Sequence, residues 1–256
     1  MHAHVAMRLV IEGGFLPDDI TPHPPLRAEQ VGGGYQLVFD RKAEDWKELT
    51  IIGGLKSKTV DIVACKEGIG PVVCVSVKGT GNAFRNLTNR MEEAIGDCTN
   101  LHVMYPGLVY GFLHLLKGNR SGQAGVRDND VSVLPDGQVV PAIVRYHDLL
   151  RELSGRKFVR NDFTRYEAVA LIMVDGAPGS GGTIMPHFPP DDSPLLATRF
   201  FDTIYRVYDL RYPYMGLALR QARRVVWDPA SPALVQIGEA TGQEPETALG
   251  YCPRTA

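Results

Sequence analysis

The stretch from Thr59 to Glu93 limits the fold of this chain more than any other segment. Residues 59–65 and 72–78 are two short apolar runs rich in β-branched side chains, and the turn sequence Gly-Ile-Gly-Pro lies between them. This pattern predicts a β-hairpin. From residue 82 the apolar side chains recur at helical spacing, and the pattern ends near Gly96. The stretch therefore predicts two paired strands followed directly by an amphipathic helix.

Strand and helix patterns also alternate along the rest of the chain. One or two strands are predicted within residues 101–116, further strands at 35–39, 166–175 and 223–227, and helices at 40–49, 141–155 and 195–210. Residues 1–34 are rich in Pro and Gly and predict an irregular arm with at most one short strand. This mixture predicts an α/β (α+β) fold with a mixed central sheet flanked by helices.

A chain of 256 residues can bury a large core, and no segment is separable by its composition. We therefore expect a single domain over residues 1–256. Its core is expected at roughly 40–175, between the irregular arm and a region of helix and loops at 176–256.

The formal net charge of −2 gives no overall basic field of the kind that marks many nucleic-acid-binding proteins. This counts only weakly against DNA binding, because an acidic metal site lowers the net charge by itself. The four cysteines form no Cys-x-x-Cys pair, which argues against a zinc site or a disulfide framework. No apolar run approaches the roughly 20 residues that span a bilayer, and a secretory signal pattern is missing, so we expect a cytoplasmic protein.

Polar side chains interrupt the two apolar runs of the predicted hairpin. Because side chains alternate along a strand, Asp61 is expected to share a face with Thr59 and Val63. Ser76 and Lys78 share a face of the second strand in the same way. The pattern predicts that polar groups emerge together where the two strands end.

The predicted helix continues this polar group. Arg85, Asn89 and Glu92 lie at helical spacing and form a polar stripe, so Glu92 can meet Asp61 and Lys78 if the helix packs over the hairpin. Two carboxylates can hold Mg²⁺, which prefers oxygen ligands. A lysine beside them can orient a water molecule and offset charge that develops on a phosphate. These are the residue types that phosphodiester hydrolysis requires.

Over roughly residues 40–116 the pattern resembles the PD-(D/E)xK nuclease superfamily, in which one hairpin strand carries an Asp and the next carries (D/E)-x-K. This chain departs from the pattern at Ser76, which stands where the second acid is expected. In one restriction-endonuclease branch of the superfamily the following helix supplies the missing carboxylate, about 14 positions after the lysine. That offset from Lys78 leads to Glu92, and its neighbour Glu93 is an open alternative.

The resemblance implies a restriction-endonuclease-like core. It also implies the function of a Mg²⁺-dependent type II restriction endonuclease that cuts double-stranded DNA. It implies Asp61 and Glu92 as metal ligands, Lys78 as the residue that positions the attacking water, and Ser76 in an accessory role. Such enzymes generally act as homodimers on palindromic sites.

Three residues of the predicted helix, Arg85, Asn89 and Arg90, are candidate DNA contacts, because Arg and Asn are the usual readers of G and A. The enzymes of that restriction-endonuclease branch cut around CCGG cores, and their arginine-rich recognition signatures lie closer to the lysine than Arg85 does here. The CCGG specificity therefore cannot be carried over to this chain.

Two other functions are compatible with the sequence. Ser76 could mark decay of the catalytic site, which would leave a catalytically inactive DNA-binding subunit of a defence complex. Alternatively, the Gly-rich segment 176–183 could serve a small-molecule enzyme, although Gly182 replaces the lysine that a phosphate-binding loop requires.

Overall fold

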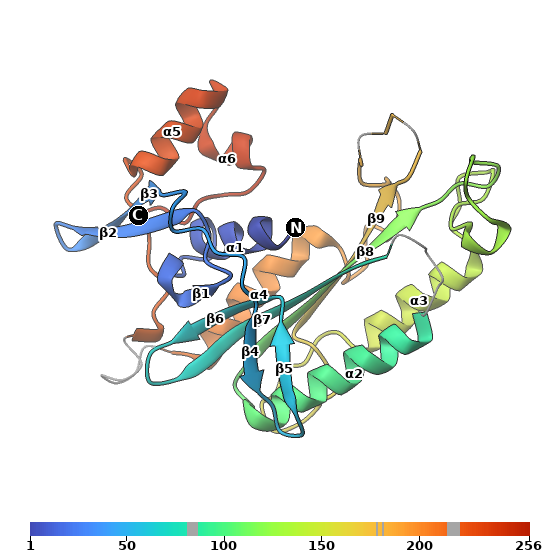
Figure 1. Cartoon of the computed structure of the whole chain (residues 1–256), viewed down its shortest axis with the longest axis horizontal. Helices are drawn as coiled ribbons and strands as arrows, with labels where there is room; N and C mark the ends of the chain where they lie inside the picture. The colour runs from blue at the N-terminus through green and yellow to red at the C-terminus, as the bar shows by residue number, and fades with distance from the viewer. Residues whose placement is uncertain (81–86, 178, 181, 214–220) are drawn as a thin grey trace. The chain divides into compact units, whose positions relative to one another are not determined.

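The computed structural model describes residues 1–80, 87–177, 179–180, 182–213 and 221–256 (Figure 1). Contacts between residues divide the chain into two compact units. The first unit comprises residues 1–51, 59–74 and 208–256, and the second comprises 52–58 and 75–207. The single-domain expectation stays a prediction.

A mixed five-stranded sheet forms the centre of the fold, as predicted. Its strands follow the spatial order β1 (Ile20–Thr21), β6 (Ile62–Lys66), β7 (Gly70–Thr80), β8 (Val109–Gly118) and β9 (Ala168–Asp175). Strands β1 and β6 pair antiparallel, whereas β8 and β9 pair parallel from Gly111–Ala168 to Gly118–Asp175. With the helices that flank this sheet, the predicted α/β class is confirmed. Its restriction-endonuclease-like character stays a prediction.

The first unit begins with helix α1 (His2–Ile11), which buries an apolar face. Strands β2 (Leu26–Val31) and β3 (Gly34–Phe39) form an antiparallel hairpin, and helices α5 (Pro232–Thr241) and α6 (Pro245–Leu249) follow near the end of the chain. Strand β4 (Leu49–Ile52) belongs to this unit except for its last residue. The fully buried Trp227 donates its indole N–H to the carbonyl of Val10 at 2.8 Å, which ties the C-terminal segment to α1.

The second unit contains the crossover from β7 to β8 through helix α2 (Leu87–Met104), and the longer connection through helix α3 (Pro141–Glu152) to β9. Helix α4 (Ala197–Arg211) packs on one face of β8: a Cβ at Gly111 would meet the side chains of Phe200 and Ile204. Alternation along β8 places Tyr110, Phe112 and His114 on its opposite face.

Several predicted elements are confirmed. The strand predicted at 35–39 is β3, those predicted at 72–78 and 166–175 are β7 and β9, and the helices predicted at 141–155 and 195–210 are α3 and α4, each within a few residues.

Four predictions are wrong. The expected irregular arm begins with α1, whose buried Val5, Leu9 and Val10 follow helical spacing but lack a capping signal. The residues predicted as a helix at 40–49 form turns before β4, and in the strand predicted at 223–227 only Trp227 makes isolated bridges. Helix α2 continues past Gly96 to Met104, because the burial of Cys98 and Leu101 outweighs the low helix propensity of glycine. The strand expected from residue 101 is therefore helical up to Met104.

The most consequential difference concerns Asp61. The apolar run 59–65 is not one strand: β5 (Ser57–Val60) ends before Asp61 and β6 begins after it. Asp61 therefore lies at a bend, and the expectation that it shares a strand face with Thr59 and Val63 is wrong.

Among the described residues, no helix combines the length and the apolar character needed to cross a membrane.

Gly14, just after α1, offers a test of the packing within the first unit. It has φ +69°, and a Cβ there would overlap the carbonyl oxygen of Val225, whose N–H donates to the Gly14 carbonyl at 2.8 Å. We expect Gly14→Ala to lower the free energy of unfolding by about 2–3 kcal/mol, measured by urea denaturation.

Gly32 is the matched control, since it also has a positive φ but a Cβ there meets nothing within 4 Å. Gly32→Ala should cost only the conformational strain, about 1 kcal/mol. Equal losses for the two variants would show that the contact with Val225 is unimportant.

Candidate functional site

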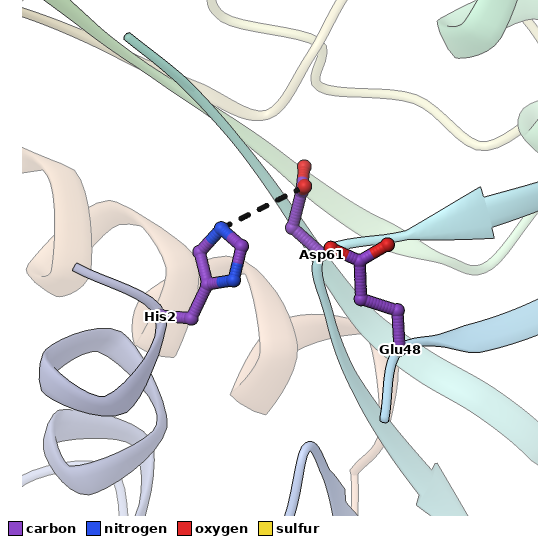
Figure 2. Close-up of side chains that lie close together, drawn as sticks. All are labelled: His2, Glu48 and Asp61. Atoms are coloured by element: carbon purple, nitrogen blue, oxygen red, sulfur yellow. Dashed lines mark ion pairs between the residues drawn. The ribbon is translucent and has the colours of Figure 1, made fainter. Parts of the chain in front are cut away.

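Three metal-ligating side chains from separate segments meet in the first unit (Figure 2). His2 comes from the first residue of α1, Glu48 directly precedes β4, and Asp61 occupies the bend before β6. One ligand atom from each lies within 4.8 Å of the others, and His2 Nε2 is 3.7 Å from Asp61 Oδ1. We call these three residues the His2 cluster.

The position of Asp61 follows from the local fold. Val60 and Ile62 on either side of it are fully buried, while only 12% of the Asp61 side chain is exposed. A largely buried carboxylate is unfavourable unless polar or charged groups surround it. At the bend, the Asp61 carboxylate lies beside His2, and the Glu48 carboxylate lies nearby (Figure 2).

The donor set of the His2 cluster fits a divalent cation. The two carboxylates match the oxygen ligands that Mg²⁺ prefers. The imidazole nitrogen extends the choice to transition metals, which accept nitrogen ligands more readily. The sequence pointed to Asp61 alone: Glu48 fell in a segment predicted as a helix, and His2 in a segment predicted as irregular.

A second group of polar residues surrounds a small cavity in the second unit. Ser76 and Lys78 from β7 line it together with Phe112 from β8, Tyr166, and four residues of α2: Arg90, Glu93, Ala94 and Asp97. We call this the Lys78 cavity. It brings together three residues predicted for the site, Ser76, Lys78 and Arg90.

Charges alternate along the α2 side of this cavity. Lys58 lies 2.5 Å from Asp97 and 3.8 Å from Glu93, and Arg90 lies 3.5 Å from the other oxygen of Glu93. Each acid of the cavity thus has a basic partner. The Ser76 hydroxyl is 2.9 Å from the hydroxyl of Tyr110, a buried contact that accounts for Ser76 without a role in chemistry.

Two basic groups of the cavity also act on a buried histidine. His114 is fully buried on β8, and its Nδ1 lies 2.5 Å from the hydroxyl of Tyr146. Burial lowers the pKa of His114 to about 4, with smaller contributions from the charges of Arg90 and Lys78. Burial also raises the pKa of Tyr146, so this pair is neutral at physiological pH. The charges of Arg90 and Lys78 thus oppose protonation of His114.

The remaining predicted residues lie elsewhere. Glu92 and Asn89 are exposed on α2, and the cavity lining contains Glu93 in place of Glu92. Arg85 lies outside the described residues. Of the two adjacent glutamates, Glu93 lines the Lys78 cavity together with Asp97 of the same helix, and which glutamate would bind a metal stays a prediction.

The Gly-rich segment after β9 does not resemble a phosphate-binding loop. In the described part of residues 176–196 no helix follows it, and α4 starts only at Ala197. Asp175 at its start pairs with Arg120 at 2.9 Å, which anchors the segment to the loop after β8.

Comparison of the chain with protein families, with curated proteins and with solved structures finds no match.

The lowered pKa of His114 predicts a pH dependence of stability. The unfolded state binds a proton near pH 6.5, while the folded state stays neutral until about pH 4, so stability falls as the pH drops through this window. Between about pH 7 and about pH 5 the loss from this residue should be about 2 kcal/mol.

Urea denaturation of the unmodified chain and of His114→Gln at both pH values tests this, because glutamine keeps an acceptor for Tyr146 but does not titrate. The variant should lose less stability on acidification. The same loss in both proteins would contradict a buried, neutral His114.

Proposed function

We propose that this protein is a divalent-metal-dependent endonuclease that hydrolyses DNA phosphodiester bonds. The observation that carries this proposal is the convergence of Asp61, Glu48 and His2 at the bend before β6. Asp61 is the residue that the PD-(D/E)xK resemblance implies as a metal ligand, and it lies among other ligating groups instead of facing an apolar core.

The metal ligands in this proposal are the three residues of the His2 cluster. Glu48 takes the part that the sequence pattern gave to Glu92, so the second carboxylate comes from the segment before the hairpin instead of the helix after it. A divalent cation held there would polarise the scissile phosphate and activate a water molecule. Mg²⁺ remains the cation that the resemblance implies.

From the resemblance alone, Lys78 is proposed as the residue that orients the water. It lies on β7 within the second unit, and its side chain is partly exposed. Glu93 and Ser76 line the same cavity, and Glu93 pairs with Arg90. The ion pair with Glu93 limits the positions that the Arg90 side chain can adopt.

The distribution of charge supports a nucleic acid as the substrate. The first unit carries 11 Lys and Arg against 15 Asp and Glu, whereas the second carries 16 against 14. The acidic excess thus lies in the unit with the proposed metal ligands, and the unit with Lys78 is basic. Double-stranded DNA and a homodimer on a palindromic site complete the proposal, both from the resemblance alone.

Plasmid cleavage by the purified chain with Mg²⁺ or Mn²⁺ tests the proposal. Asp61→Asn and Lys78→Met should each lower the cleavage rate at least about 100-fold, because each removes a group that acts on the reacting phosphate or water. Discrete fragments would indicate sequence specificity. DNA binding without cleavage under either metal would favour the inactive DNA-binding subunit.

The adjacent glutamates of α2 give a matched pair of variants. Glu93→Gln should lower the cleavage rate about 10-fold, since it removes a charged neighbour of Arg90 in the Lys78 cavity. Glu92→Gln should leave the rate within about twofold, because Glu92 does not line the Lys78 cavity. The reverse order would restore Glu92 to the role that the sequence pattern implied.

Metal binding can be measured without DNA by isothermal titration calorimetry. Asp61→Asn should weaken both Mg²⁺ and Mn²⁺ binding by about 10- to 100-fold. His2→Gln should weaken Mn²⁺ more than Mg²⁺, because nitrogen ligands favour the transition metal. His4→Gln is the control, since His4 lies on the same helix but packs edge-to-face on Tyr251 with ring centroids 6.0 Å apart. Unchanged binding in every variant would contradict the His2 cluster as the metal site.

A further inference from the structure

A short loop in the second unit leaves the body of the protein and returns to almost the same point. The N–H of Arg156 donates to the carbonyl of Tyr166 at 3.0 Å, and the N–H of Tyr166 donates to the carbonyl of Leu153 at 2.7 Å. We call residues 156–165 the Arg156 loop. Its closed ends precede β9 directly, so the loop is attached to the central sheet.

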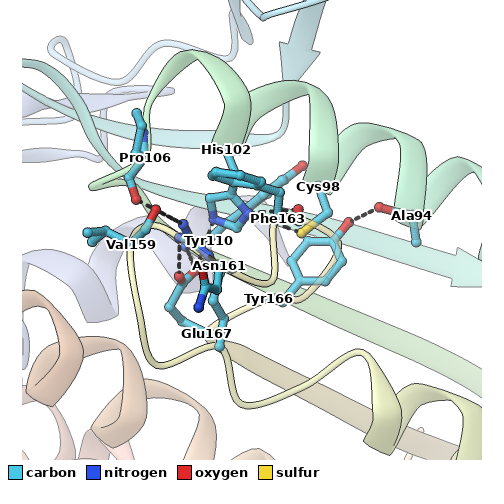
Figure 3. Close-up of polar contacts among 11 residues, drawn as sticks. Ala94, Cys98, His102, Pro106, Tyr110, Val159, Asn161, Phe163, Tyr166 and Glu167 are labelled. Carbon is cyan, nitrogen blue, oxygen red and sulfur yellow. Dashed lines mark hydrogen bonds and ion pairs between the residues drawn. The ribbon is translucent and has the colours of Figure 1, made fainter.

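The Arg156 side chain holds this loop through hydrogen bonds to its backbone. Figure 3 shows the polar contacts of this region, with the partners Val159, Asn161, Pro106 and Glu167 labelled. Its guanidinium is buried and pairs with the buried Glu167 at 2.8 Å. The same group donates to the loop carbonyls of Val159 at 2.9 Å and Asn161 at 3.3 Å, and to Pro106 at 3.1 Å. One fixed side chain therefore sets the course of the loop backbone, and the loop surface is preorganised.

The outer surface of the loop combines an aromatic ring with cations. Phe158 is 67% exposed, and its neighbours Lys157 and Arg160 are exposed as well. Among the described residues neither of these two cations has an ion-pair partner, whereas Arg165 lies 3.9 Å from Glu152. With most of its surface exposed, Phe158 contributes little to the packing of this unit.

We propose that the Arg156 loop is a contact for a DNA strand, in which Phe158 stacks on an unpaired or unstacked base while Lys157 and Arg160 contact phosphates. This inference rests on the proposed DNA-directed function. Stacking of bases on aromatic side chains beside basic residues is the usual means of holding single-stranded nucleic acid, and it tolerates any base because every base has a π-face. An apolar side chain can also enter a base step of a duplex and unstack it.

The loop is connected to the Lys78 cavity within the same unit. Tyr166, which closes the loop, also lines that cavity and donates its hydroxyl to the carbonyl of Ala94 on α2 at 2.7 Å. Tyr166 therefore connects the Arg156 loop, where the DNA strand would bind, to the Lys78 cavity.

The composition of the loop favours nucleic acid over a protein partner. Large contiguous apolar patches mark many protein-docking surfaces. Here only Val159 extends the apolar surface of Phe158 along the chain, and cations occupy the neighbouring positions on both sides.

Fluorescence anisotropy with a labelled single-stranded DNA oligonucleotide, and with its duplex, tests this inference. The full chain is titrated with EDTA present, so that cleavage plays no part in the measurement. Phe158→Ala should weaken binding of the single strand about 5- to 100-fold, whereas Phe158→Tyr should keep most of the affinity. Lys157→Gln with Arg160→Gln should reduce the slope of log affinity against log salt by about 1–2.

Matched controls come from the first unit. Trp46 is 64% exposed, so Trp46→Ala removes an equally exposed aromatic ring, and Arg41→Gln with Lys42→Gln removes two exposed cations. These variants should bind like the unmodified chain. Equal effects of the loop and control variants, or tighter binding of an RNA of the same sequence than of the DNA, would overturn the inference. DNA binding that depends on Phe158 in a chain that does not cleave would support it and refute only the proposed nuclease activity.

Discussion

The buried carboxylate of Glu167 is the interaction on which the second unit depends. One oxygen accepts the backbone N–H of Tyr110 at 2.6 Å and lies 3.3 Å from Nε2 of His102 on α2, while the other accepts from Arg156 at 2.8 Å. A single side chain thus connects α2, β8 and the segment before β9. Burying a charge is costly unless it is paired and fully hydrogen-bonded. This carboxylate is paired with Arg156 and accepts a second hydrogen bond from Tyr110, and these partners come from different segments.

Such a network fixes the relative positions of α2, β8 and the segment before β9 more than it adds to the free energy of unfolding. Apolar residues of similar volume can often replace a buried ion pair with little loss of stability, but the loss of one partner leaves a buried charge without compensation. The side chains around Glu167 hold the Lys78 cavity and the Arg156 loop in fixed positions within the unit. The surfaces proposed to contact DNA are therefore set by groups that have no contact with solvent.

The sequence was sufficient to predict elements whose local pattern and tertiary packing agree. Strand β7, helix α3 and strand β9 have strong periodicity and clear ends, and they form where expected. The prediction failed where packing overrides local preference. Helix α1 has no capping residue, and α2 passes through Gly96 because the residues beyond it are buried against the sheet.

The candidate site was predictable only in part. Asp61 and Lys78 stood out because charged residues are rare in apolar strands. Glu48 and His2 carry no such signal, since they are polar residues in polar segments, and only the tertiary fold brings them to Asp61. Phe158 also carries no signal in the sequence, since it is one aromatic residue in a loop. Only the structure shows that the buried Arg156 holds the backbone beside it at Val159.

The closed ends of the Arg156 loop determine which of its residues can be substituted independently. Arg156, Tyr166 and Glu167 lie in one hydrogen-bonded group, and substitutions within such a group are not additive. The exposed residues 157–160 are under no such restriction, because their side chains are exposed and their backbone is held by Arg156. Substitutions at the exposed residues 157–160 can therefore change the surface of the loop without disturbing the buried hydrogen bonds that hold it. Transfer of the loop to another protein would require Arg156, Tyr166 and Glu167 to move with it.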